Sequence, residues 1–295
     1  MIRTAIGRQK TAGLFLGFLL AVLVTKIMAV DAKASTAGIE RILNEISLWT
    51  NAPLPSAEAV KQSCGMNMVC AARMLAKAMG PDARLTRQQH PDTDTIRMVR
   101  NLPSITRIEY PGTGILRVRF TRFGRTAIQE LETALMTSQQ AIRTLEVDLR
   151  DHRGGNLRAM MRLASWFTGP VHKALALQRT GGKLKWLDLN SFKDGASELT
   201  RPRIRVIVNQ NTASSAEIFA ALLRRYAGAR ILGNSRTRGK NWLLRTIAVT
   251  HDLVLLVPAE RIHVPGESLT GGLLPDAPFP PAERSKNTER KSGEP

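Results

Sequence analysis

From Ile105 onward, short β-branched runs alternate with segments of helical period, and this alternation constrains the fold more than any other feature. The runs "ILRVRF" at 115–120 and "LEVDL" at 145–149 predict strands, and residues 126–140 between them carry apolar side chains on one helical face. Strands joined by crossover helices predict an α/β fold with a buried parallel sheet. Further expected elements are strands at 204–208, 230–233, 243–250 and 253–258, a hairpin turning at Gly181-Gly182, and helices after Gly155 and at about 215–227.

The preceding part of the chain has a different texture. Residues 38–80 carry apolar side chains at helical spacing and end at Gly80-Pro81, which predicts a small helical segment. The polar stretch that follows, 81–95, is interpreted as a linker or surface excursion. We therefore expect a helical N-terminal segment with a linker at 35–103, a core at 104–280 and a polar, disordered tail at 281–295.

The first 34 residues have the order of a secretory signal peptide. Basic residues (Arg3, Arg8 and Lys10) precede an uncharged run from Thr11 to Thr25, and "AVDAKAST" follows with the small-x-small pattern of a cleavage site. The run is shorter than the roughly 20 residues of a typical membrane span. We expect removal of residues 1–34 and export to the periplasm or outside the cell, with an uncleaved membrane anchor as the alternative.

Export permits a disulfide between the chain's two cysteines, Cys64 and Cys70. Positions six apart on one continuous helix differ by about 9 Å of rise, beyond the reach of the bond. A disulfide therefore requires a turn at 65–67 before the next helix begins. Two free, buried thiols are the alternative.

The whole chain has a formal charge of +19. Removing residues 1–34 takes away five basic side chains and one acid, which leaves +15. This balance favours anionic partners such as an envelope surface. Nucleic acid is not expected, because the basic residues are dispersed, only two tyrosines occur and no nucleic-acid-binding motif is present.

Two adjacent serines stand where the strand at 204–208 gives way to a helix, in "VIVNQNTASSAEIF". The first-turn N–H groups of a helix have no intrahelical acceptor. Ser214 could simply cap the helix, since Glu217 three residues later completes a capping-box pattern. The same free N–H groups and the helix dipole also suit a nucleophile, because they stabilise a developing oxyanion.

A nucleophilic serine needs a base, and two candidates differ in their pH signature. His152 lies beside the Gly154-Gly155 pair, whereas His251 and His263 fall in strand-like runs. Lys240 follows Gly239 in a turn-rich stretch, and partial burial together with nearby arginines would favour its neutral form. A lysine base predicts hydrolysis that rises toward alkaline pH, and a histidine base predicts a midpoint near 6.5.

Four blocks of the sequence resemble the C-terminal processing peptidases, the tail-specific serine proteases. "TASSAEIFAALLRRYAGARILG" followed by "TRGK" is similar to their nucleophile and base blocks. Upstream, "LEVDLRDHRGGNL" resembles their Gly-Gly block, and "VPGESLTGGLLPD" resembles their closing segment. The blocks occur in the family's order between about 104 and 278. The resemblance implies an α/β core of the Clp protease/crotonase-like type.

The resemblance also implies a serine endopeptidase with a Ser-Lys dyad and no metal or organic cofactor. Carried onto this sequence, the nucleophile is Ser214 and the base is Lys240, which stands one residue further along than usual. Ser215 and the pair Gly154 and Gly155 would supply the oxyanion N–H groups. Extended polypeptides or C-terminal tails would be the substrates.

Several positions depart from the family pattern. Leu244 stands where a glutamine often orients the lysine, and Arg225 stands where an aspartate sometimes occurs. Asp151 and His152 replace asparagines that are common before the glycines. Residues 35–103 are too helical to form the peptide-binding PDZ module of most members. A catalytically silent peptide-binding protein on the same fold is therefore the alternative function, and a binder of anionic surfaces is the third.

Overall fold

The computed structural model describes residues 37–88, 102–190 and 202–279 and confirms the α/β class. The chain divides into two compact units, each of which is described by itself. Among the described residues, unit 1 takes in 37–88 together with Gln178–Leu184 and Trp242–Arg261. Unit 2 takes in 102–177, 185–190, 202–241 and 262–279. The expected signal peptide and C-terminal tail lie outside the described residues, and within the described residues no helix is long and apolar enough to span a membrane.

Unit 1 combines helices with a small antiparallel sheet. A helix at 37–47 precedes α2 (Ala57–Cys64) and α3 (Met68–Met79), which confirms the expected helical segment. Strands β1 (Arg84–Arg87) and β9 (Trp242–Ala248) both pair antiparallel with β10 (Leu253–His263).

The interpretation of residues 84–87 as part of a linker was wrong. These residues form β1, because their backbone pairs with β10 and Leu85 packs against the apolar core of unit 1. That core is built from side chains of the helices and of β9 and β10, among them Ile42, Leu75 and Val257, which are fully buried.

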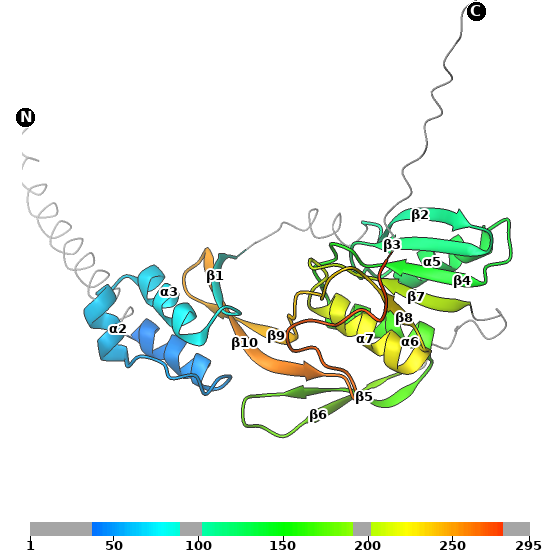
Figure 1. Cartoon of the computed structure of the whole chain (residues 1–295). Helices are drawn as coiled ribbons and strands as arrows, with labels where there is room; N and C mark the ends of the chain where they lie inside the picture. The colour runs from blue at the N-terminus through cyan, green and yellow to red at the C-terminus, as the bar shows by residue number, and fades with distance from the viewer. Residues whose placement is uncertain (1–36, 89–101, 191–201, 280–295) are drawn as a thin grey trace, which may run out of the picture. The chain divides into compact units, whose positions relative to one another are not determined.

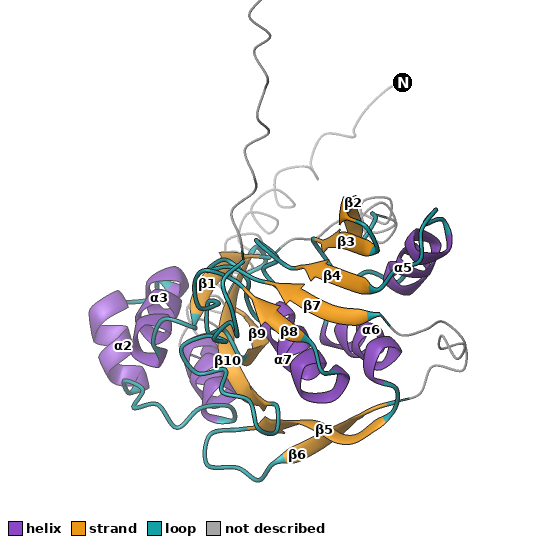
Figure 2. Ribbon diagram, turned by 45° about the vertical axis from the view of Figure 1, so that its right-hand side comes forward, coloured by secondary structure: helices purple, strands orange, loops and turns teal. Residues whose placement is uncertain are grey.

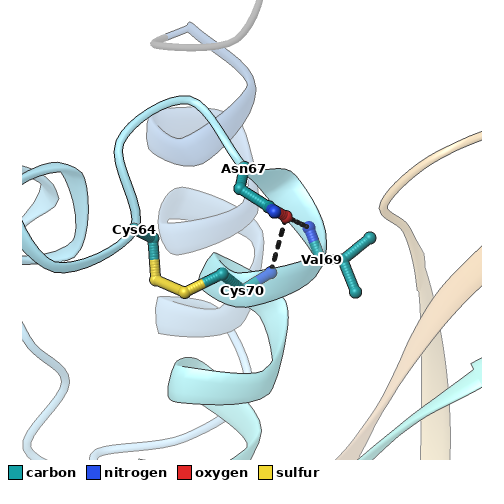
Figure 3. Close-up of a disulfide and its surroundings, with 4 residues drawn as sticks. All are labelled: Cys64, Asn67, Val69 and Cys70. Atoms are coloured by element: carbon teal, nitrogen blue, oxygen red, sulfur yellow. Dashed lines mark hydrogen bonds between the residues drawn. A yellow bond between two sulfur atoms is a disulfide. The ribbon is translucent and has the colours of Figure 1, made fainter.

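A disulfide joins Cys64 and Cys70 where α2 meets α3 (Figure 3). Helix α2 ends at Cys64, and Gly65 takes a positive φ of 58° that turns the chain. The side chain of Asn67 then starts α3 by accepting the N–H groups of Val69 at 3.1 Å and Cys70 at 3.0 Å. This turn brings the two Cα atoms to 5.5 Å, within the usual range for a disulfide.

Unit 2 is built on a five-stranded sheet in the order β2-β3-β4-β7-β8. The pairs from β3 to β8 are parallel, and β2 joins β3 antiparallel at one edge. Helices α5, α6 and α7 lie on one side of this sheet (Figure 2). The bounds are β2 Ile105–Gly112, β3 Ile115–Phe120, α5 Ala127–Met136, β4 Thr144–Asp148, α6 Leu157–Thr168, β7 Arg203–Ile207, α7 Ser215–Ala227 and β8 Arg230–Leu232.

The two faces of this sheet differ because side chains alternate along each strand. On β3, Leu116, Val118 and Phe120 are fully buried. The opposite face carries a charged row in which Glu146 bonds to Arg117 at 2.8 Å and to Arg205 at 3.3 Å. The predicted hairpin also forms, with β5 (Val171–Gln178) antiparallel to β6 (Lys185–Leu189).

Candidate functional site

Two turns meet at the carboxyl ends of β4 and β7, which are neighbouring parallel strands. The chain leaves β4 through residues 149–156 into α6, and it leaves β7 through residues 208–214 into α7. In open α/β sheets, ligand sites gather at this end of the strands. The sequence-predicted residues Gly154, Gly155, Ser214 and Ser215 all lie in these two turns or at the start of the helices that follow.

Backbone and side-chain hydrogen bonds join the two turns. The Ala213 N–H donates to the carbonyl of His152 at 3.0 Å, and the Thr212 hydroxyl donates to the carbonyl of Leu149 at 2.9 Å. The carboxylate of Asp151 accepts from the side-chain amides of Asn209 and Asn211, both at 3.0 Å. These bonds, led by the one from Asn211, lower the pKa of Asp151 below its ordinary value, and Asp151 therefore stays ionised.

Ser214 occupies a strained position directly before α7. Its backbone angles are φ 58° and ψ −129°, a region that non-glycine residues seldom adopt. Strain of this kind gathers at functional sites because the surrounding structure must hold it in place. Ser214 itself is partly exposed, whereas Ser215, at the first position of the helix, is buried.

Gly154 lies against Ser214 so closely that only glycine fits. A Cβ on Gly154 would come within 2.7 Å of the Ser214 Cβ and 2.8 Å of the Ala213 carbonyl. Gly155 has open space around it, and its carbonyl accepts the Ser215 hydroxyl at 3.3 Å. The structure thus brings both predicted glycines to the start of α7.

The N–H groups of these residues are not equivalent. The Gly154 N–H donates to Nδ1 of His152 at 3.0 Å. Within residues 37–88, 102–190 and 202–279, the N–H groups of Gly155 and Ser215 donate no hydrogen bond. These two N–H groups, one from each turn, are available for an oxyanion.

The carboxylate of Glu217 joins the start of α7 to the loop that carries Lys240. Its Oε2 accepts the backbone N–H groups of Ser214 at 2.7 Å and of Lys240 at 2.8 Å. Its Oε1 accepts the Thr237 hydroxyl at 2.5 Å and the Gly239 N–H at 2.7 Å. Glu217 is 1 % exposed, and four donors compensate for burying its carboxylate.

Sequence reasoning assigned Glu217 only half of this role. The spacing of Ser214 and Glu217 predicted the capping-box bond from the Ser214 N–H, and that bond forms. The bonds to Thr237, Gly239 and Lys240 were missed, because no local rule connects residues 20 or more positions apart. The signal available was the turn-rich "TRGK" stretch, which needs an anchor for its N–H groups.

The Lys240 loop is fixed on further sides within unit 2. The Arg238 N–H donates to the Thr212 carbonyl at 2.9 Å, which ties the loop to the Ser214 turn. The Leu273 N–H donates to the Thr237 hydroxyl at 2.7 Å. Gly239 has φ 78°, and a Cβ there would lie 2.8 Å from the Gly272 nitrogen. Lys240 itself is partly exposed.

His152, the sequence-derived alternative base, is buried and 1 % exposed. Burial lowers its pKa from 6.5 to about 4, so the ring is neutral at ordinary pH. Its Nδ1 is occupied by the Gly154 N–H, and it makes no hydrogen bond to Ser214 in the described part of the chain. Leu244 stands where a glutamine often orients the lysine in the C-terminal processing peptidases. It lies in β9 and has no polar side-chain group.

Within the described residues, no group of three or more His, Cys, Asp or Glu side chains comes together in a way that could hold a metal ion. The polar groups that converge at this site are hydroxyls, backbone N–H groups, the His152 imidazole and the carboxylates of Asp151 and Glu217. Because the imidazole Nδ1 and both carboxylates already accept hydrogen bonds, the set suits the acyl-transfer chemistry of a serine nucleophile better than metal ligation.

Comparison with known proteins agrees with this geometry. Residues 114–279 match the profile of peptidase family S41. A probable CtpA-like serine protease of Staphylococcus epidermidis is 24% identical over 253 residues, which are 83% of this chain and 48% of the relative. The chloroplastic carboxyl-terminal-processing peptidase 2 of Arabidopsis thaliana is 24% identical over 71% of this chain and 42% of its own length. The chain thus spans about half the length of the curated relatives it matches.

A solved structure of a lipoprotein from Streptococcus agalactiae superposes with a TM-score of 0.61 at 14% identity, over 83% of this chain and 92% of that one. At this identity the match speaks for the fold alone. Together with the family profile, it confirms the expected α/β core of the Clp protease/crotonase-like type.

Proposed function

Since this chain belongs to peptidase family S41, we propose that it hydrolyses peptide bonds with Ser214 as the nucleophile and Lys240 as the general base. The Ser214 hydroxyl attacks the scissile carbonyl while the neutral amine of Lys240 takes its proton. The resulting ammonium returns the proton to the leaving amine, and an acyl-enzyme remains on Ser214. Water, activated by the same lysine, then releases the second product.

The single observation that carries this proposal is the shared carboxylate of Glu217. Oε2 of Glu217 holds the backbone N–H of Ser214 and the backbone N–H of Lys240 at the same time. The candidate nucleophile and the candidate base therefore start from backbone positions on either side of one oxygen atom. Such fixed placement of two reacting groups is what general-base catalysis by a side chain requires.

The proposed oxyanion hole uses the N–H groups of Ser215 and Gly155. Ser215 stands at the first helical position, where an N–H has no intrahelical acceptor. Gly155 comes from the neighbouring turn, and the bond from the Ser215 hydroxyl to its carbonyl holds the two residues together. Two such donors stabilise the negative charge of a tetrahedral intermediate.

The proposed substrates are extended polypeptides or the C-terminal tails of proteins. Two of the relatives are named as a CtpA-like serine protease and a carboxyl-terminal-processing peptidase, which supports this class. The signal-peptide pattern of residues 1–34 supports a site of action in the periplasm or outside the cell. The proposed steps use no metal or organic cofactor.

The test is digestion of casein and of a C-terminally tagged peptide. Ser214→Ala should abolish turnover, a loss on the order of 10⁶ in kcat. Lys240→Ala should lose nearly as much, while Lys61→Ala, which removes an exposed lysine from α2, should leave kcat unchanged. Ser215→Ala should have a milder effect, because Ser215 acts through its backbone. Equal turnover by the wild type and Ser214→Ala would refute the proposal.

The alternative functions predict binding without turnover. Binding of the tagged peptide without turnover by the folded wild type would support the silent peptide-binding protein. Binding to anionic vesicles that disappears at about 1 M salt, where the Debye length is about 3 Å, would support the anionic-surface partner suggested by the +15 charge.

A further inference from the structure

The ring of His152 packs against Phe123, the first of a row of aromatic side chains that reaches α7. The imidazole ring lies 4.4 Å from the ring of Phe123, centroid to centroid. Phe123 in turn lies 5.2 Å from Phe219 on α7, which packs edge-on against Phe167 of α6 at 5.7 Å. This packing fixes the orientation of the imidazole relative to the helix that begins after Ser214.

The hydrogen bonds of His152 define its tautomer. Because Nδ1 accepts the Gly154 N–H, it carries no proton, and the neutral ring must be protonated at Nε2. Nε2 is buried and has no hydrogen-bond partner in the described part of the chain. Burying a polar atom without a partner costs free energy. The packing of the ring and its bond from the Gly154 N–H therefore have to offset this cost to keep the ring in place.

We propose that His152 is a positioning residue that holds the Gly154–Gly155 turn in the conformation that stabilises the oxyanion. Because His152 accepts the Gly154 N–H, that N–H is not available to an oxyanion. The Gly155 N–H is then the donor that this turn offers to the oxyanion. The inference rests on the proposed function of Ser214, because an oxyanion forms only if Ser214 attacks a carbonyl.

The neighbouring charged groups are engaged elsewhere, so the ring responds to burial and not to a charged partner. Asp151 bonds to Asn209, Asn211 and Arg119, and Arg150 bonds to Asp148. The Glu217 carboxylate is occupied by its four donors. Burial is the largest cause of the lowered pKa of His152, and no charged side chain contributes to it. Protonation of Nδ1 in acid would displace the Gly154 N–H and release the turn.

Two substitutions separate positioning from base catalysis. In His152→Asn, Oδ1 occupies the place of Nδ1 and still accepts the Gly154 N–H, but the side chain does not titrate. In His152→Leu, a methyl group replaces the acceptor. The exposed residue His172, substituted as His172→Leu, is the matched control.

Steady-state kinetics with the tagged peptide should show kcat about 10²-fold lower in His152→Leu, with KM little changed, because a displaced oxyanion donor acts on the transition state. His152→Asn should retain most of kcat, and His172→Leu should match the wild type. Equal inactivation of the folded Asn and Leu variants would overturn the inference.

A second readout does not depend on turnover. In the Ser214→Ala background, the ¹⁵N and ¹H shifts of the Gly154 amide should titrate with a midpoint of about 4, and His152→Asn should abolish this titration. A Gly154 amide that does not respond to His152 protonation would overturn the inference even in an active enzyme. Inactive wild type with a titrating Gly154 amide would refute the proposed function while confirming the contact on which the positioning role depends.

Discussion

The helical segment of unit 1 and the Ser214 turns of unit 2 are stabilised by different means. Unit 1 is held by an apolar core and a disulfide. The turns of unit 2 are held by buried polar groups. Apart from Glu260, every buried polar or charged side chain in the described chain lies in unit 2. The described non-glycine residues with positive φ, Asp151, Lys173 and Ser214, also all lie in unit 2.

This difference indicates where the chain carries chemistry. An apolar core tolerates substitutions that preserve its volume, whereas a buried polar network is destabilised when one member loses its partner. Two of the three strained residues, Asp151 and Ser214, lie in these turns, and the buried carboxylate of Glu217 accepts the Ser214 N–H, as the proposed role of Ser214 would require. Unit 1 is stabilised chiefly by apolar burial, whereas the turns that carry the proposed site combine strained backbone with buried polar groups.

The largest expected effect comes from Glu217→Ala, which removes the acceptor at the centre of the buried polar network of unit 2. The substitution leaves four donors without their acceptor. At roughly 1 kcal/mol for each donor, the free energy of unfolding of unit 2 should fall by about 4 kcal/mol. Turnover should also be lost, because the Ser214 and Lys240 backbones are no longer tied to one oxygen. Urea-dependent hydrogen exchange, read separately for peptides of α7 and α3, measures the change in each unit.

Two variants control this measurement. Glu58→Ala removes an exposed carboxylate from the first turn of α2 and should change stability little. Glu217→Gln keeps the shape and one good acceptor, so it should fall between the wild type and the Ala variant. A Glu217→Ala protein as stable and as active as the wild type would show that the Glu217 network contributes neither stability nor placement.

The second effect is a loss of stability in acid, and it also arises in unit 2. The folded pKa of His152, about 4, lies below its ordinary 6.5, so the unfolded chain binds a proton first as the pH falls. The free energy of unfolding should therefore decrease between about pH 6.5 and 4 and level off below, by about 3 kcal/mol in total from this residue. His152→Asn should lack this component in urea titrations at pH 7, 5.5 and 4. Identical pH dependence in the two proteins would contradict the buried, neutral assignment of His152.

The smallest effect is expected from removing the disulfide of unit 1. Replacing both Cys64 and Cys70 with serine opens a short loop and should lower the stability of unit 1 by about 2 kcal/mol. Exchange should increase in α2 and α3 and stay unchanged in α7. A control with Cys64 and Cys70 intact, measured with and without reductant, should reproduce the difference. Faster exchange in α7 alone would contradict the conclusion that the disulfide stabilises unit 1.

Much of the fold was predictable because periodicity is a local property. The strands at 115–120, 145–149 and 204–208 and the helix at 215–227 formed within one residue of their expected bounds. Strand β1 was missed, since these four residues, two of them arginines, acquire strand structure only by pairing with β10. Tertiary contacts decide such short segments.

The candidate site was predictable to a lesser degree. The strand-to-helix junction and its spare N–H groups pointed to Ser214 and Ser215, and the resemblance pointed to Lys240, Gly154 and Gly155. The long-range role of Glu217 was not accessible, because its spacing from Ser214 already had a sufficient local explanation. The contact between His152 and Gly154 depends on which way a ring is packed, and sequence patterns do not contain that information.

The proposed nucleophile is tested most directly by identifying the residue that an electrophilic probe phosphonylates. The folded protein is treated with a biotinylated fluorophosphonate, digested and analysed by tandem mass spectrometry. We expect labelling of Ser214 in the wild type, none in Ser214→Ala, strong reduction in Lys240→Ala and retention in Lys61→Ala. A label on Ser215, or undiminished labelling of Ser214 without Lys240, would contradict it.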